Sequence, residues 1–152
     1  MVNHIVPKKN FHLLDMACGT GDIAFSFFER NKNLLQGSKL TLCDININML
    51  DMARSKGLPN DIFDCVCANA EDLPITSNTV DAYTVAFGLR NVTNINSALK
   101  EAYRVMKPGG KFLCLEFGKV NSALIEKIYS TYSKKFIPNL GKLVTGNRGA
   151  YE

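Results

Sequence analysis

Apolar residues along the chain fall into two alternating patterns, short continuous runs and stretches with helical spacing. The short runs, which we predict to be β-strands, are Leu13–Ala17, Lys39–Cys43, Ile62–Ala68, Val80–Phe87 and Lys111–Phe117. The helical stretches are residues 21–34, the segment around Met49–Ala53 that Gly57 and Pro59 end, and Ser97–Met106. Strands that alternate with helices over short connections predict a mainly parallel sheet covered on both faces, which is a doubly wound α/β fold.

Glycine and polar residues follow four of these predicted strands. They are Gly19 and Gly21 after the first, Asp44 after the second, Asn69 after the third and residues 88–91 after the fourth. In an open parallel sheet the ligand crevice lies at the carboxyl ends of the strands. The sequence therefore predicts one ligand site built from these loops.

The loop after the first strand combines glycine with carboxylates. Gly19 and Gly21 permit positive φ and let backbone N–H groups approach a ligand. Their spacing fits the dinucleotide fingerprint G-x-G-x-x-A, a weak signal by itself. Asp15 and Asp22 would oppose a pyrophosphate by ~1 kcal/mol or more each at an effective dielectric constant of ~20. They would attract the sulfonium and ammonium groups of S-adenosylmethionine, so we predict that ligand.

Asp44 extends the argument to a nucleoside. It stands 23 positions after Gly21, close to the spacing at which an acidic residue meets ribose hydroxyls. That role is common to NAD and S-adenosylmethionine, and the alternative role for Asp44 is a cap on the next helix. Asn69, or a backbone N–H beside it, is placed to meet the adenine edge.

Composition and charge set the broad class. The 152 residues are 46% hydrophobic and 21% charged, which predicts a single globular domain over residues 1–152. A net charge of +4 is too small to indicate nucleic-acid binding. Residues 1–76 hold seven basic and nine acidic side chains and residues 77–152 hold eleven and five, so the first half suits a cationic ligand and the second an anionic surface.

Cysteine and histidine positions do not indicate a metal site. The five cysteines include no C-x-x-C pair, and four of them lie in predicted strands, as expected for free thiols in a reducing compartment. His4 and His12 have no further ligand at metal-binding spacing. We see no leader and no apolar run long enough to span a membrane, so we expect a cytoplasmic protein.

The end of the chain has a different pattern. Apolar residues from Leu124 to Phe136 form a helical stripe beside Lys134, Lys135 and Lys142. Residues 119–152 could therefore pack on the core, line the substrate side of the site, or contact a membrane surface.

The chain resembles class I S-adenosylmethionine-dependent methyltransferases, and more narrowly the UbiE-type ubiquinone and menaquinone biosynthesis C-methyltransferases. The segments that carry the resemblance are Leu14–Asp22, Cys43–Asn46, Ala86–Thr93 and Val105–Phe117. The resemblance implies a Rossmann-like sheet and contacts to S-adenosylmethionine from Thr20, Asp44, Asn69 and Ala70. Asp15, Gly19, Gly21 and Ala86 are the further residues that we expect at the cofactor site. The family position at Ala86 can carry Ser, so a hydroxyl contact is lost here. Family members extend beyond both ends of this chain, so we expect the last strands of the sheet to be missing.

The resemblance also implies a reaction. S-Adenosylmethionine would methylate a ring carbon of a polyprenylated benzoquinol or naphthoquinol. We predict that Arg90 stabilises the phenolate and that Asn91 holds the second ring oxygen; Arg90 could instead form only a surface ion pair. The prenyl tail suggests peripheral contact with the inner membrane, in the mitochondrial matrix if the source is a eukaryote.

Two other functions were weighed. The first is a truncated, non-catalytic S-adenosylmethionine-binding protein or scaffold in a quinone-synthesis complex, and a homodimer is equally open. The second is a short-chain NAD(P)-dependent oxidoreductase, which uses the same loop together with a Tyr-x-x-x-Lys pair. We expect no tyrosine of this chain to supply that pair.

Overall fold

The computed structural model describes residues 1–57 and 59–118. The chain divides into two compact units, Met1–Glu116 and Phe117–Glu152, and of the second unit only residues 117 and 118 are described. The predicted amphipathic segment of residues 119–152 and its lysines lie outside the described residues, so the single-domain prediction and the membrane contact stay predictions.

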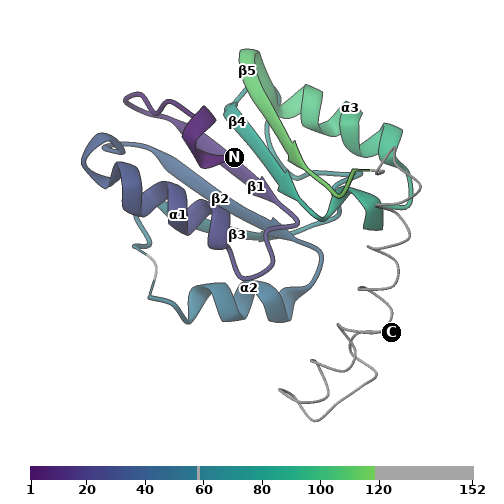
Figure 1. Ribbon diagram of the computed structural model, residues 1–152, viewed down its shortest axis with the longest axis horizontal. Helices are drawn as coiled ribbons and strands as arrows, with labels where there is room; N and C mark the ends of the chain where they lie inside the picture. Colours follow the sequence, from purple (N-terminus) through teal and green to yellow (C-terminus); the bar gives the residue numbers. More distant parts are fainter. Residues whose placement is uncertain (58, 119–152) are drawn as a thin grey trace, which may run out of the picture. The chain divides into compact units, whose positions relative to one another are not determined.

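The first unit contains one five-stranded sheet (Figure 1). Its strands are β1 (His12–Met16), β2 (Lys39–Asp44), β3 (Phe63–Cys67), β4 (Val80–Ala86) and β5 (Met106–Leu115). Every neighbouring pair is parallel, and the order across the sheet is β3-β2-β1-β4-β5. The direction of winding therefore reverses between β1 and β4, which confirms the doubly wound α/β fold and places the crevice at that point.

Three α-helices connect the strands. They are α1 (Asp22–Asn31), α2 (Ile47–Arg54) and α3 (Ile95–Val105), with short 3-10 turns η1 (Val2–His4), η2 (Lys32–Leu34) and η3 (Leu89–Asn91). Asn46 and Asn94 cap α2 and α3 through side-chain oxygens that accept backbone N–H groups of the first turn. α1 begins instead at Gly21, whose φ of 80° is left-handed.

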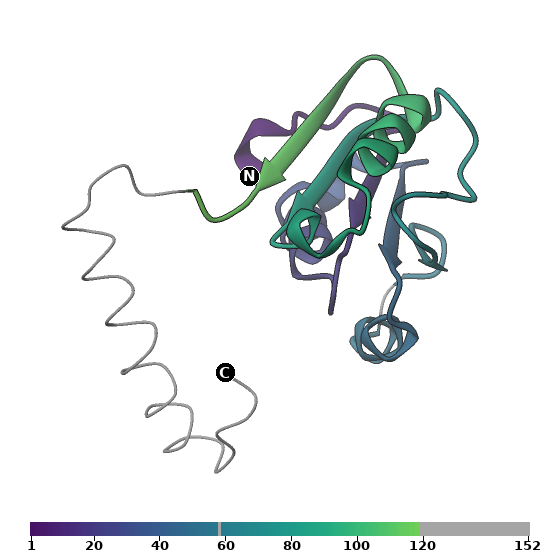
Figure 2. The same cartoon turned by 90° about the vertical axis from the view of Figure 1, so that its right-hand side faces the viewer.

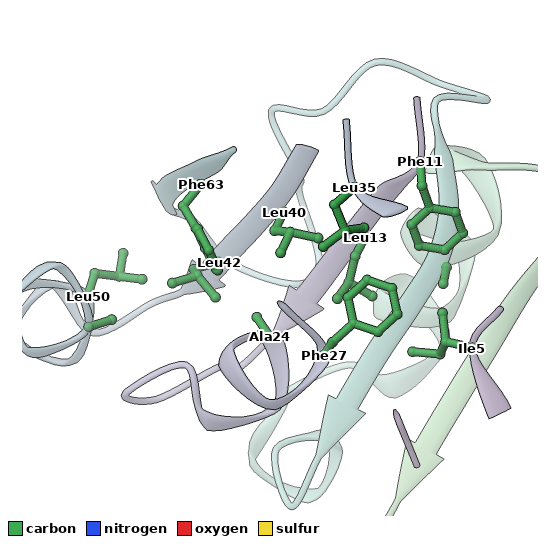
Figure 3. Close-up of a cluster of buried hydrophobic side chains, with 12 residues drawn as sticks. Ile5, Phe11, Leu13, Ala24, Phe27, Leu35, Leu40, Leu42, Leu50 and Phe63 are labelled. Atoms are coloured by element: carbon green, nitrogen blue, oxygen red, sulfur yellow. The ribbon is translucent and has the colours of Figure 1, made fainter. Parts of the chain in front are cut away.

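Alternation along the strands divides the core between the two faces of the sheet. Leu13, Leu40 and Leu42 pack against α1 and α2 in the cluster shown in Figure 3. The adjacent positions Leu14 and Cys43 point to the opposite face, where they pack with residues of α3. Figure 2 shows α3 lying along that face. Each strand of the centre is thus buried on both sides, as a parallel sheet requires.

The last strand differs most from its predicted bounds. We expected Lys107–Gly110 to end a helix and the strand to begin at Lys111, but β5 begins at Met106. A register shift between Val80 and Ala82 accommodates the extra residues. Gly110 packs so closely on the backbone of β4 that a Cβ atom would lie 3.2 Å from the Val80 carbonyl oxygen. A short-range pattern does not report this contact.

Within the described residues, no helix is both long and apolar enough to span a membrane.

Candidate active site

A pocket of about 360 Å³ opens at the carboxyl ends of the strands. Its lining comes from the ends of β1, β2 and β4, from the segments that follow β1, β2, β3 and β4, and from the start of α2. The lining residues are Met16, Ala17, Gly19, Asp44, Ile45, Asn46, Met49, Asn69, Ala70, Glu71, Tyr83, Val85, Ala86, Phe87, Gly88, Leu89, Asn91, Val92 and Thr93. Six of the predicted site residues are therefore brought together: Gly19, Asp44, Asn69, Ala70, Ala86 and Asn91. This size and position are typical of a small-molecule site at a topological switch point.

The glycine loop forms one wall of this pocket. The N–H of Gly21 donates to the carbonyl of Cys18 over 2.8 Å and closes a tight turn. Gly19 has a φ of 54°, and a Cβ atom built on it would meet nothing within 4 Å, so its face is open to a ligand. Gly21 does not line the pocket; a Cβ there would lie 3.1 Å from Leu42. Glycine is thus needed for two different reasons. At Gly19 it lets a ligand approach the backbone, and at Gly21 it lets the loop pack against Leu42.

Asp44 joins the second strand to this loop. Its Oδ2 accepts the N–H of Gly19 over 2.9 Å, and its Oδ1 accepts the N–H of Asn46 over 2.9 Å. An ionised carboxylate has about four acceptor positions, so each oxygen can accept a further hydroxyl from a ligand. The predicted cap role is wrong, because Asn46 and not Asp44 caps α2. The ligand role of Asp44 stays a prediction.

The placement of Asp15 differs from the sequence-based expectation. Its side chain lies on the α1 side of the sheet and is fully buried, whereas the neighbouring Met16 points into the pocket. Asp15 Oδ1 accepts the hydroxyl of Thr84 over 2.7 Å, and Oδ2 accepts the N–H of Ala24 over 3.3 Å. Burial raises the pKa of Asp15 to about 7, although both hydrogen bonds lower it. Asp15 thus supports the start of α1 from beneath.

Asp22 also has a different role from the one expected. Its Oδ1 accepts a hydrogen bond from Lys56 Nζ over 2.7 Å, and this hydrogen bond lowers the pKa of Asp22. Thr20 donates its hydroxyl to the same carboxylate and does not line the pocket. Because Lys56 compensates the charge of Asp22, this carboxylate contributes little to the field at the pocket.

The charge of the pocket comes from two other carboxylates. Among residues 1–57 and 59–118, Asp44 and Glu71 are the charged side chains that line it, and none of the lining residues described is basic. Glu71 Oε1 accepts the N–H of Asn94 over 3.0 Å, which fixes it at the rim. Asn69 Oδ1 accepts the N–H of Glu71. This acidic lining favours a cationic ligand and disfavours a diphosphate.

Backbone strain occurs where the loops after β1 and β4 meet. Ala17 and Phe87 have φ angles of 51° and 55°, a region that non-glycine residues rarely occupy. A Cβ atom built on Gly88 would lie 2.3 Å from the Cβ of Ala17, so glycine is required there by close approach. Such strain is held in place by surrounding structure and clusters at functional sites.

Arg90 lies on η3 between the pocket-lining residues Leu89 and Asn91. Its guanidinium Nη1 is 3.0 Å from Glu116 Oε2, and its backbone N–H donates to Glu116 Oε1. The side chain is 49% exposed and does not itself line the pocket. The ion pair that we weighed as the alternative is thus present, and the role of Arg90 toward a substrate stays a prediction.

The comparison with family models decides the classification. All of residues 1–152 match the model of the ubiE/COQ5 methyltransferase family. The chain belongs to this family.

Proteins that are similar to this chain support this family membership. The chain is 47% identical over 150 residues to the ubiquinone/menaquinone biosynthesis C-methyltransferase UbiE of Rickettsia bellii, and 46% identical to that of Rickettsia prowazekii. Each alignment covers 97% of this chain and 60% of the relative, so the chain spans about three fifths of the curated relatives it matches. An S-adenosylmethionine-dependent methyltransferase of Aquifex aeolicus has the same fold, with a TM-score of 0.60, 24% identity, and coverage of 70% of this chain and 56% of that one.

One detail of the oxidoreductase alternative needs correction in this ubiE/COQ5 family member. Tyr103 does stand four residues before Lys107, so the Tyr-x-x-x-Lys spacing is present. The structure separates the pair from the pocket, because Tyr103 is 81% exposed on α3 and Lys107 donates to Asp81, at the amino-terminal end of β4. Position, rather than spacing, disfavours that function.

The sequence patterns did not identify several residues of the site or its supports. Thr84 and Lys56 contact the glycine loop or its supports from 36 or more positions away, and their partners depend on strand register and helix orientation. Glu71 and Met49 line the pocket, but each reads as an ordinary turn or helix residue. The one available signal for Thr84 was a hydroxyl side chain between the apolar residues Tyr83 and Val85 of a predicted strand.

Replacement of Thr84 by Val tests the support of the loop. The folded pKa of Asp15 is raised from 3.8 to about 7, so stability is lost as the pH rises from about 3.8 to about 7, and at pH 8 the buried carboxylate is mostly ionised. The Thr84 hydroxyl stabilises the ionised form. Thr84→Val should therefore lower the free energy of unfolding by about 1–3 kcal/mol at pH 8 and by less at pH 6. Urea denaturation at both values measures it. Ser38→Ala removes a buried hydroxyl that accepts the backbone N–H of Phe11, and it should cost the same at both pH values. An equal cost at both values for Thr84→Val would contradict the account.

A pair of substitutions tests the close approach of the two loops. Gly88→Ala places a methyl group against the Ala17 methyl and should lower the free energy of unfolding by about 1–3 kcal/mol. Ala17→Gly removes that methyl group and also relieves the positive φ. The double variant should regain most of the loss in thermal unfolding. If the double variant is no more stable than Gly88→Ala alone, the contact is not the cause.

Proposed function

We propose that this chain binds S-adenosylmethionine in the pocket between β1 and β4 and transfers its methyl group to a ring carbon of a prenylated quinol. The observation that supports the binding of S-adenosylmethionine is the negative charge of the side chains that line the pocket. Among the described lining residues the charged ones are acidic, and they adjoin the glycine loop. That field strengthens the binding of a sulfonium and an ammonium group, whereas it weakens the binding of the pyrophosphate of a dinucleotide.

The residues present fit the parts of this ligand. The open face of Gly19 leaves room where a Cβ would intrude, Asp44 has acceptor positions for ribose hydroxyls, and Asn69 and Ala70 lie where an adenine edge would meet the loop after β3. S-Adenosylmethionine supplies an electrophilic methyl group when bound. The side chains hold the donor and exclude water; they do not need to supply a covalent intermediate.

Two features support an aromatic, apolar substrate. The curated relatives are named for ubiquinone and menaquinone biosynthesis. The pocket wall opposite Asp44 is apolar, with Val85, Phe87, Leu89 and Val92 along β4 and the turn after it. A quinol ring with a prenyl tail matches such a wall. The tail also motivates peripheral membrane contact and assembly with other quinone-synthesis proteins, both of which are proposals.

Arg90 is the proposed partner of the phenolate. A ring carbon becomes nucleophilic when the neighbouring phenol loses its proton, here to water, and a guanidinium beside the oxygen favours that loss. Glu116 holds Arg90 through two contacts, so the cation is oriented before substrate arrives. Asn91, which lines the pocket, is the candidate for the second ring oxygen.

Loss of the Asp44 carboxylate tests the ligand site. Asp44→Asn removes a charge from the pocket and one acceptor, and should weaken S-adenosylmethionine binding about tenfold or more in a calorimetric titration. Asp51→Asn removes a carboxylate of the same length from the exposed side of α2, where it pairs with Arg54, and serves as the matched control. Equal affinities of the two variants would remove Asp44 from the site.

The reaction is tested with a methyl-labelled donor and prenylated benzoquinol and naphthoquinol acceptors. The chain should give a ring-methylated product. Arg90→Ala should reduce the turnover by about 10²-fold or more while S-adenosylmethionine affinity changes less than about threefold. Arg54→Ala, a surface arginine of α2, should leave both unchanged. Donor binding without any product would favour the non-catalytic scaffold, and a large loss of donor affinity in Arg90→Ala would contradict the assigned role.

A further inference from the structure

Lys56 contacts the glycine loop from outside the pocket, and the proposed reaction does not yet use it. We infer that Lys56 is a positioning residue, which fixes the loop by holding the carbonyl oxygen of Thr20. The inference rests on the proposed function in one respect only, that the loop binds S-adenosylmethionine. The bonds themselves are independent of that assignment.

The end of α2 aims this lysine at the loop. The helix ends at Arg54, and the next turn closes through hydrogen bonds from the N–H of Lys56 to the carbonyl of Ala53 and from the N–H of Gly57 to that of Arg54. Gly57 has a φ of 73°, a left-handed conformation that glycine adopts without penalty. This turn directs the side chain of Lys56 away from α2 and toward the start of α1.

The ammonium group of Lys56 contacts three groups. Nζ donates to the carbonyl oxygen of Thr20 over 2.8 Å and to Oδ1 of Asp22 over 2.7 Å. It also lies 4.7 Å from the centre of the Phe25 ring. That ring stacks on Phe63 of β3, with ring centres 5.6 Å apart, so the ammonium sits over a ring that is itself fixed.

The carbonyl bond matters because of the geometry of the loop. In a trans peptide the C=O and the following N–H point in opposite directions. Holding the Thr20 carbonyl toward Lys56 therefore holds the Gly21 N–H toward Cys18, the bond that closes the turn. Asp44 fixes the loop from β2 through the N–H of Gly19. Lys56 fixes the opposite side, so the open face of Gly19 is set by both.

The ion pair alone does not explain this arrangement. Asp22 is 82% exposed, and pairs at such exposed positions contribute little to stability because water and salt screen them. The carbonyl bond acts on the loop directly, whereas the ion pair acts on the first turn of α1. The two contributions can therefore be separated by substituting each partner.

The test compares four variants of the whole chain. Lys56→Met keeps the length of the side chain and removes the donor, and Lys56→Arg restores donors. Asp22→Asn removes the ion pair and leaves the carbonyl bond. Arg54→Met is the matched control, because Arg54 also lies at the end of α2 and also bonds one carboxylate and one carbonyl, those of Asp51 and Cys65, with no bond to the loop.

Four quantities are measured on each variant. They are the dissociation constant of S-adenosylmethionine by calorimetry, the free energy of unfolding, the Michaelis constant of the quinol, and the rate of amide hydrogen exchange at Gly19 and Gly21 without ligand. Lys56→Met should weaken binding about fivefold to tenfold and speed exchange at both glycines, with the Michaelis constant of the quinol unchanged. Lys56→Arg should recover most of the affinity, and Asp22→Asn and Arg54→Met should change affinity less than about twofold.

The outcomes separate this inference from the proposed function. If the unaltered chain binds S-adenosylmethionine and Lys56→Met binds it equally well, the positioning role is wrong and the proposed function stands. If the unaltered chain does not bind this ligand, the proposed function is wrong, and the exchange rates alone decide whether Lys56 fixes the loop. An equal loss of affinity in Arg54→Met would mean that the effect of Lys56→Met comes from a general loss of stability and not from its bond to the loop.

Discussion

The site depends on how the backbone of one short glycine loop is held. Glycine makes this backbone able to approach a ligand, and the same freedom would leave it poorly defined without partners. Two side chains supply partners to the loop itself: Asp44 accepts the N–H of Gly19, and Lys56 donates to the carbonyl of Thr20. A third, Asp15, accepts the N–H of Ala24 in the helix that follows the loop. These side chains come from β2, from the turn after α2 and from β1, so the shape of the loop depends on the sheet and its first crossovers.

The acidic character expected of this region is present, but it arises from other groups. Asp22 is compensated by Lys56, and the buried Asp15 has a pKa near 7, so neither gives the pocket a full negative charge at neutral pH. Asp44 and Glu71 line the pocket instead. These two carboxylates face the ligand space and favour a positively charged ligand. The carboxylate in the first strand serves folding and loop geometry instead.

Local patterns were sufficient for the elements, and long-range contacts were not visible in them. Each strand could be predicted because apolar runs of five to eight residues between glycine or polar segments are typical of buried β-strands. The start of β5 at Met106 was missed because a Pro-Gly-Gly sequence normally ends an element, and only the packing of Gly110 on β4 reverses that. Asp44 and Asn69 could be placed beside the pocket because they stand at the carboxyl ends of two predicted strands. The contacts of Lys56 and Thr84 were not, since each bridges elements whose register is fixed only in the folded chain.

The central claim is that the pocket beside the glycine loop selects a positively charged nucleoside and rejects a diphosphate. The most direct measurement is a pair of calorimetric titrations of the unaltered chain, one with S-adenosylmethionine and one with NAD, in the same buffer at low ionic strength. The account predicts saturable binding of S-adenosylmethionine, weakened by added salt, and no measurable binding of NAD. Saturable binding of NAD together with no binding of S-adenosylmethionine would contradict it.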